Sequence, residues 1–141
     1  MKATRITGTG SALGGPGTEV GDPGTEVPPY RAPAYPLLTF DPYFSIWSFG
    51  DQLAGSWPRH WTGKNHAIVC FARIDGKTYR LIGNALGSVP PMPLVRTAVH
   101  PTRTVYEFSA GGVDVAMTFT SPLLPGDLAT FSRPVAYVSW Q

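Results

Sequence analysis

Hydrophobic and polar residues alternate most regularly between positions 113 and 120. Val113, Val115, Met117 and Phe119 fall on one side of an extended chain, and the residues between them fall on the other. A period of two residues is typical of a β-strand with one buried face. The sequence therefore predicts a strand whose four apolar residues face the core.

A β-hairpin is predicted around Asp75-Gly76. Aliphatic and aromatic residues are frequent in both flanking runs, 68–74 and 77–82. A two-residue type I′ turn needs positive φ at both central positions, which Asp and Gly adopt more readily than most residues. We therefore expect two antiparallel strands joined by this turn.

A second hairpin is expected between the runs 104–109 and 113–120, joined by an Ala-Gly-Gly connection. Tyr106 and Phe108 can supply its matching apolar face, with Glu107 pointing outward. Other short β-prone runs lie at 37–40, 44–48, 94–99 and 135–140. Short strands and hairpins without an amphipathic helix are typical of an all-β antiparallel β-sandwich, or of part of a larger one. Because the last run meets the chain end, we expect a domain truncated at its C-terminus.

Composition changes sharply near residue 33. The first 36 residues include 13 that are Gly or Pro, and the segment 15–20 is nearly repeated at 22–27. Such a segment buries too little apolar surface to offset the entropy of ordering. We predict a disordered Pro/Gly-rich leader or linker at 1–32 and a β-sandwich region at 33–141. The leader lacks the apolar stretch of a secretory signal.

Charge and residue usage exclude several classes of partner and cofactor. The formal net charge of +2 is too weak to predict a nucleic-acid or anionic-membrane partner. No apolar stretch approaches the roughly 20 residues of a membrane span. Cys70 is the only cysteine and is expected to be an inert buried thiol. His60 and His66 have no further ligands at metal-binding spacing, so we predict neither a metal nor a cofactor.

Residues 49–65 show no periodicity and are predicted to form one long loop, a kind of segment that is often functional. Its part 57–64 concentrates aromatic rings and cations. One interpretation is recognition, in which the rings of Trp57 and Trp61 stack on sugar rings or cover a neighbouring domain. Arg59 and Lys64 would then hold a carboxylate. The other is that the Trp rings pack beneath the loop and the charges stay solvated.

Two carboxylates, Asp41 and Asp51, lie among aromatic loop residues, where a shifted pKa could serve acid–base chemistry. Asp41 precedes Pro42, so the alternative is that its side chain caps a turn. No Gly-x-Ser-x-Gly motif is present to anchor a nucleophilic serine.

Five segments carry a distinctive succession of motifs: LLTFDPYFSIWS at 37–48, RHWTGK at 59–64, IDGKTYRL at 74–81, TFTSPLLP at 118–125 and SRPVAYVSW at 132–140. Their order and spacing resemble the N-terminal region of the glutaminase A-like family. The resemblance covers roughly residues 33–141.

This resemblance implies a parent protein that hydrolyses L-glutamine to glutamate and ammonia, with an N-terminal β-sandwich region before a large helical domain of α/α-toroid type. The present chain would then be a non-catalytic fragment. Its partner would be the missing helical domain of the same polypeptide, and a small-molecule substrate would bind only in the full-length parent. The resemblance also implies an extracellular or periplasmic parent.

No catalytic residue can be carried over by this resemblance. It does mark two signature stretches, 41–47 and 59–64, as candidate contacts with the substrate or with the helical domain. These candidates are Asp41, Tyr43, Trp47, Arg59, His60, Trp61 and Lys64. An alternative function is a carbohydrate-binding or carbohydrate-processing accessory β-sandwich module, since such modules also precede helical toroids.

Overall fold

The computed structural model of the protein describes residues 32–141. These residues form one compact unit. The predicted leader at 1–32 therefore lies almost wholly outside the described residues.

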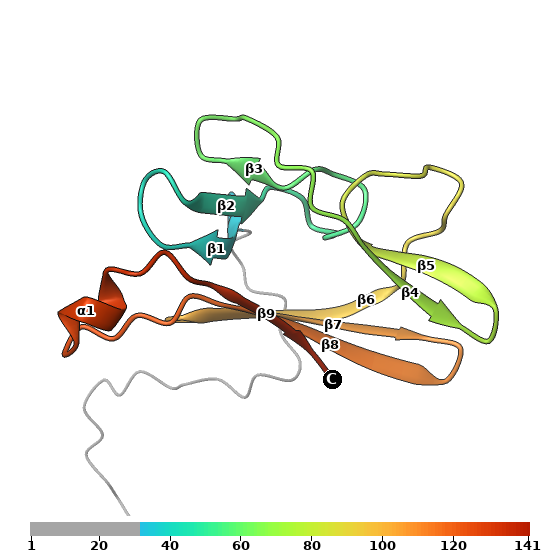
Figure 1. The fold of residues 1–141 in the computed structure, drawn as a ribbon. Coiled ribbons are helices and arrows are strands. Elements are labelled where there is room, and N and C mark those ends of the chain that lie inside the picture. The colour runs from blue at the N-terminus through green and yellow to red at the C-terminus, as the bar shows by residue number, and fades with distance from the viewer. Residues whose placement is uncertain (1–31) are drawn as a thin grey trace, which may run out of the picture. The chain divides into compact units, whose positions relative to one another are not determined.

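The described unit is built almost entirely from β-strands, with one short helix (Figure 1). In chain order the elements are β1 (Tyr35–Thr39), β2 (Ser45–Ser48), β3 (Arg59–His60), β4 (Cys70–Ile74), β5 (Lys77–Ile82), β6 (Leu94–His100), β7 (Arg103–Ala110), β8 (Val113–Thr120), α1 (Leu128–Phe131) and β9 (Tyr137–Trp140).

The strands form three antiparallel sheets. Their orders are β1-β2-β3, β4-β5 and β6-β7-β8-β9. In Figure 1 the two smaller sheets lie on one side of the four-stranded sheet, and β1 contacts β7 and β8 across the gap. This sandwich-like arrangement confirms the predicted all-β fold class.

Both predicted hairpins are present. β4 pairs with β5 around Asp75 and Gly76, whose φ values of 47° and 81° are both positive. β7 pairs with β8 in continuous register. The second turn consists of only two residues, Gly111 and Gly112, and these also have positive φ. The two-residue turns, built from residues that adopt positive φ, therefore set the strand register of both hairpins.

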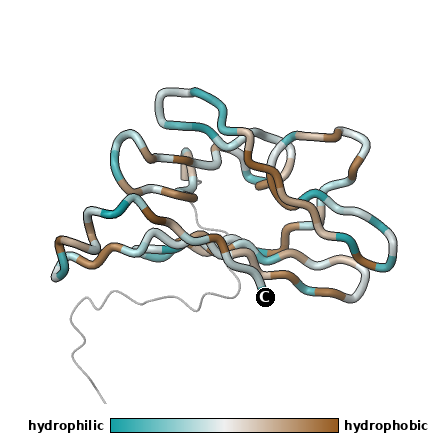
Figure 2. The backbone as a smooth tube through the Cα atoms, viewed as in Figure 1, coloured by the Kyte–Doolittle hydropathy of each residue, from teal (hydrophilic) through white to brown (hydrophobic). Residues whose placement is uncertain are grey.

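The core lies between the layers, where apolar stretches of the chain face one another (Figure 2). Tyr106 and Phe108 on β7 meet Met117 and Phe119 on β8, and all four are buried as predicted. The ring of Phe119 meets that of Tyr106 edge-on, with centroids 5.9 Å apart. β1, β2 and β5 supply the opposite side, through Leu37, Ile46, Leu81 and Ile82.

The prediction that Val113 faces the core is wrong. Its side chain is exposed, and Val115 is only half-buried. The alternation is real, but Val113 directly follows the turn at the end of the sheet. Periodicity identifies a face of the strand, whereas burial also depends on how far the opposite layer extends.

The segment 49–65 is not one uninterrupted loop. It contains β3, which adds to β2 through the register pairs Ile46–His60 and Trp47–Arg59. Earlier in the segment, Leu53 is buried in the core, and the backbone N–H of Gly55 donates to the carbonyl of Gly83. The segment therefore contributes both a strand and a core side chain.

Candidate functional site

Asp41 organises the turn between β1 and β2. Its Oδ1 accepts hydrogen bonds from the backbone N–H groups of Tyr43 (2.7 Å) and Phe44 (2.8 Å). This geometry agrees with the turn-capping interpretation of Asp41. It leaves the ring of Tyr43 at the tip of the turn, 93% exposed.

The carbonyl of Pro42 joins this turn to the segment after β3. It accepts hydrogen bonds from the indole Nε1 of Trp61 (2.7 Å) and, in one tautomer, from Nε2 of His60 (2.8 Å). Nδ1 of His60 lies 2.8 Å from Oγ1 of Thr62. Both ring nitrogens of His60 therefore already have partners, while Trp61 stays 60% exposed.

Residues 60–64 form a tight turn that presents Trp61. The N–H of Gly63 donates to the carbonyl of His60, and the N–H of His60 donates to the carbonyl of Lys64. Gly63 has a φ of 90°, which a residue with a Cβ adopts only with strain. The two signature stretches thus meet through β2–β3 pairing and through Pro42.

Arg59 and Trp47 lie opposite each other in the β2–β3 register. The guanidinium carbon of Arg59 lies 5.9 Å from the ring centroid of Phe49, within cation–π range. Nε1 of Trp47 donates to Oγ of Ser45 at 2.7 Å. Lys64 is exposed. The candidates therefore fall into two groups: Trp47 and Arg59 share one face of the β2–β3 pair, whereas His60 and Trp61 meet the turn of Asp41.

Neither group of candidates has the arrangement of an acid–base catalytic pair. Asp41 binds its own backbone, and the neighbouring His60 is held by Pro42 and Thr62. Asp51 is exposed elsewhere in the 49–65 segment. Within residues 32–141, no group of three or more His, Cys, Asp and Glu side chains comes close enough to hold a metal ion. The chemistry available here is stacking, hydrogen bonding and charge attraction.

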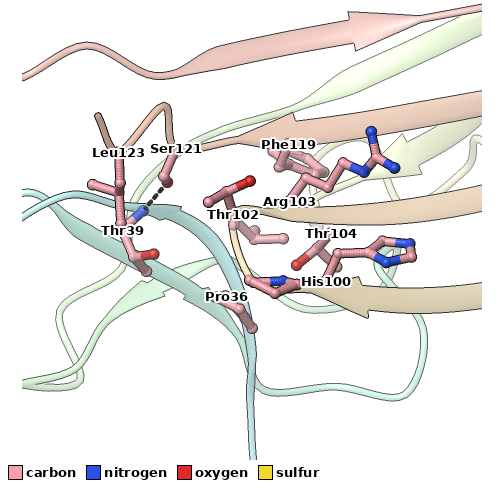
Figure 3. A pocket seen from close by; sticks show the side chains of 11 residues that line it. Pro36, Thr39, His100, Thr102, Arg103, Thr104, Phe119, Ser121 and Leu123 are labelled. Atoms are coloured by element: carbon pink, nitrogen blue, oxygen red, sulfur yellow. Dashed lines mark hydrogen bonds between the residues drawn. The ribbon is translucent and has the colours of Figure 1, made fainter. Parts of the chain in front are cut away.

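A small pocket lies between β1 and the β6–β7 turn (Figure 3). Its volume is about 40 Å³, enough for roughly one water molecule. The N–H of Thr39 donates to Oγ of Ser121 at 3.2 Å beside it. The side chains of His100 and Arg103 point away from Ser121 in Figure 3. The pocket is too small for an amino acid or a sugar.

A broader hollow of about 550 Å³ lies over β6, β7 and β8. Two carboxylates, Glu107 and Asp114, line it. Glu107 is held by Arg96 through two bonds, Nε to Oε2 at 3.1 Å and Nη2 to Oε1 at 2.7 Å. The carboxylate of Glu107 is therefore already paired with a guanidinium.

Comparison with family models gives two matches. Residues 22–94, just over half of the chain, match the model described as Domain of unknown function (DUF4964). The chain belongs to the DUF4964 family. Residues 102–141 match a second model, Domain of unknown function (DUF5127). Searches of curated proteins and of solved structures found no match.

All seven candidate residues of this DUF4964 protein lie within the 22–94 match. The second match contains a feature that the candidate set lacked. Val138 and Trp140 of β9 pair with Phe119 and Met117 of β8, so they continue the core face of the sheet. Yet Trp140 is 66% exposed, and Val138 is also exposed. No part of residues 32–141 buries this end of the core face.

The helix α1 was not predicted, and it adds further exposed apolar side chains. Leu128 and Phe131 are exposed on it, and the ring of Phe131 lies 6.2 Å from that of Phe40. Asp127 caps its first turn by accepting from the N–H of Thr130. Among the described residues of the DUF4964 protein, no helix is long and apolar enough to cross a membrane.

Sequence reasoning also missed two buried polar groups, Arg80 and the hydroxyl of Tyr106. Burial raises the pKa of Tyr106, and the nearby Ser48 hydroxyl offsets only part of that rise. Cys70 is half-buried rather than buried, and desolvation raises the pKa of its thiol. A raised pKa keeps the thiol protonated, which agrees with low reactivity.

Proposed function

We propose that this DUF4964 chain is a non-catalytic β-sandwich region of a glutaminase A-like hydrolase, whose parent converts L-glutamine to glutamate and ammonia. In this proposal the chain supports a helical catalytic domain in the same extracellular or periplasmic polypeptide. The observation that carries the contact role is the uncovered core face at β9, where Val138 and Trp140 are exposed.

The chemistry of the signature stretches supports a contact role over a catalytic one. A hydrolase that uses acid–base chemistry needs a carboxylate or imidazole free to exchange a proton with the substrate. Asp41 accepts two backbone hydrogen bonds, and both nitrogens of His60 have partners. Arg59, Lys64 and the exposed rings instead suit recognition of a neighbouring surface.

The β9 face supports the same role by its energetics. An exposed Trp adjoining a hydrophobic core is the kind of residue that anchors protein interfaces. Truncation of a buried interface Trp costs about 2 kcal/mol or more, which corresponds to roughly a thirtyfold weaker Kd. We therefore expect β9 to carry much of the affinity for the helical domain.

Isothermal titration of the chain with the separately produced helical domain of a glutaminase A-like parent tests this role. We expect binding that Trp140→Ala weakens about thirtyfold. Val113→Ala is the matched control, because Val113 is also an exposed apolar strand residue but belongs to the far end of β8. An absence of binding, or equal effects of the two substitutions, would contradict the proposal.

The alternative, a carbohydrate-binding accessory module, is favoured by one observation. The exposed rings of Tyr43 and Trp61 flank Pro42, and the bond from Trp61 to the Pro42 carbonyl fixes the indole. Fixed exposed rings can stack on the apolar faces of sugars. Titration with soluble polysaccharides, monitored by tryptophan fluorescence, would support this function if the response were saturable and were lost in Trp61→Ala.

A further inference from the structure

Arg80 in β5 is a buried arginine, with only 6% of its surface exposed. Its backbone lies beside the connection between β5 and β6, since its N–H donates to the carbonyl of Pro90 and its carbonyl accepts from the N–H of Met92. Its side chain turns to the same connection, where Nη1 donates to the carbonyls of Ala85 (2.9 Å) and Leu86 (3.2 Å).

The positive charge of Arg80 has no counter-charge among residues 32–141. The ion pair in this part of the chain joins Arg96 to Glu107 and does not involve Arg80. Nε of Arg80 is fully buried and has no hydrogen-bond partner. A buried guanidinium left with an unsatisfied donor is costly, and such groups are normally paired with an acid.

The unpaired part of Arg80 is one defined edge of the guanidinium. Both loop carbonyls bind Nη1, whereas Nε, which shares the other edge with Nη2, is buried without a partner. These two atoms are the ones that Arg96 uses to hold Glu107 in a bidentate pair. Two parallel N–H groups on this edge match the two oxygens of a carboxylate.

We propose that the Nε–Nη2 edge of Arg80 is a carboxylate-binding site, whose acid is not one of residues 32–141. Binding at this edge requires the β5–β6 connection, whose carbonyls hold Nη1, to move aside; Figure 1 shows this connection as a loop between the two strands. Asn84, Leu86 and Gly87 are exposed in this loop. The site lies outside the seven candidate residues and is independent of the proposed glutaminase parent.

The test is a ¹H–¹⁵N NMR titration of the arginine Nε–H signals in the 141-residue chain. Sodium acetate is the probe, and sodium chloride at the same ionic strength is the control. We expect acetate to shift the Arg80 Nε–H signal saturably, while chloride does not. The exposed Arg73 and Arg103 provide internal controls, and their signals should show no saturable shift.

A substitution at Arg80 distinguishes binding by its Nε–Nη2 edge from attraction by its positive charge. Arg80→Lys keeps the positive charge but has no Nε–Nη2 edge, so an acetate-dependent increase in melting temperature should be lost in it and kept in Arg103→Lys. If Arg80→Lys does not fold, the NMR titration of the unmodified chain still decides. An Arg80 signal that acetate leaves unchanged, or that chloride shifts equally, overturns the proposal.

A second titration identifies the source of the acid. L-Glutamine carries a free α-carboxylate, whereas acetate resembles the side chain of Asp or Glu. Saturation by L-glutamine at a lower concentration than acetate supports a free amino acid as the ligand. Saturation by acetate alone supports an acidic side chain of a partner polypeptide. Failure of both probes overturns the site without bearing on glutamine hydrolysis by the parent.

Discussion

Phe119→Ala is expected to be among the most destabilising single changes in this domain. The side chain is 1% exposed and packs edge-on against Tyr106, 5.9 Å away between centroids. Removal of a fully buried Phe ring costs about 3–5 kcal/mol, because apolar burial is lost and a cavity remains. A typical domain has only about 5–15 kcal/mol of stability in total.

Urea unfolding followed by tryptophan fluorescence measures this cost. With a slope of roughly 1–3 kcal/mol per M, we expect the midpoint to fall by at least about 1 M. Thr118→Ala is the matched control, because Thr118 neighbours Phe119 but lies on the other face of β8 and is half-buried. Its cost should stay below about 1 kcal/mol. Equal costs at the two positions would refute the argument that alternation along β8 reports burial.

If Phe119→Ala fails to fold, Phe119→Leu provides a milder version of the same test. This substitution keeps an apolar side chain and should cost about 1–1.5 kcal/mol. A Phe119→Leu variant as stable as the unmodified chain would also count against a tightly packed core at this position.

Three further predictions follow from single residues. Burial raises the pKa of the Tyr106 hydroxyl above its value of about 10 in the unfolded chain. As the pH rises above about 10, this hydroxyl ionises in the unfolded chain but stays neutral in the folded one, so the folded state loses stability. Urea unfolding at pH 8 and at pH 11 should therefore show a smaller alkaline loss of stability in Tyr106→Phe. In thermal unfolding, Gly83→Ala should destabilise the chain more than Gly112→Ala. Both glycines have positive φ, but only at Gly83 would the new Cβ meet a backbone oxygen, that of Ile68, at 2.5 Å. Asp41→Ala should cost about 0.5–1.5 kcal/mol by chemical unfolding, because it removes the acceptor of two turn N–H groups that water partly replaces. An unchanged stability would argue against the turn.

The sequence predicted the parts of the fold that depend on local chemistry. The turns at Asp75-Gly76 and Gly111-Gly112 need positive φ, so the residues themselves identify both hairpins. β3 could not be predicted in this way. It is only two residues long, and it exists because His60 and Arg59 pair with a strand more than ten residues earlier. The burial of Leu53 depends on similar long-range packing.

The candidate site shows the same limit. Two sequence stretches could be singled out, but only β2–β3 pairing and the Pro42 carbonyl show that His60 and Trp61 meet the turn of Asp41. Arg80 gave no signal, because a charged residue in a strand is usually exposed. Its burial depends on how the β5–β6 connection folds over it. The uncovered face at Trp140 likewise requires the register of β9 on β8.

The most direct test of the central claim is an ammonia-release assay with L-glutamine. The purified 141-residue chain is compared with a full-length glutaminase A-like parent under the same conditions. We expect release by the parent and none by the chain alone. Ammonia release by the chain that Asp41→Asn abolishes would contradict the account and place the catalytic chemistry in the β-sandwich.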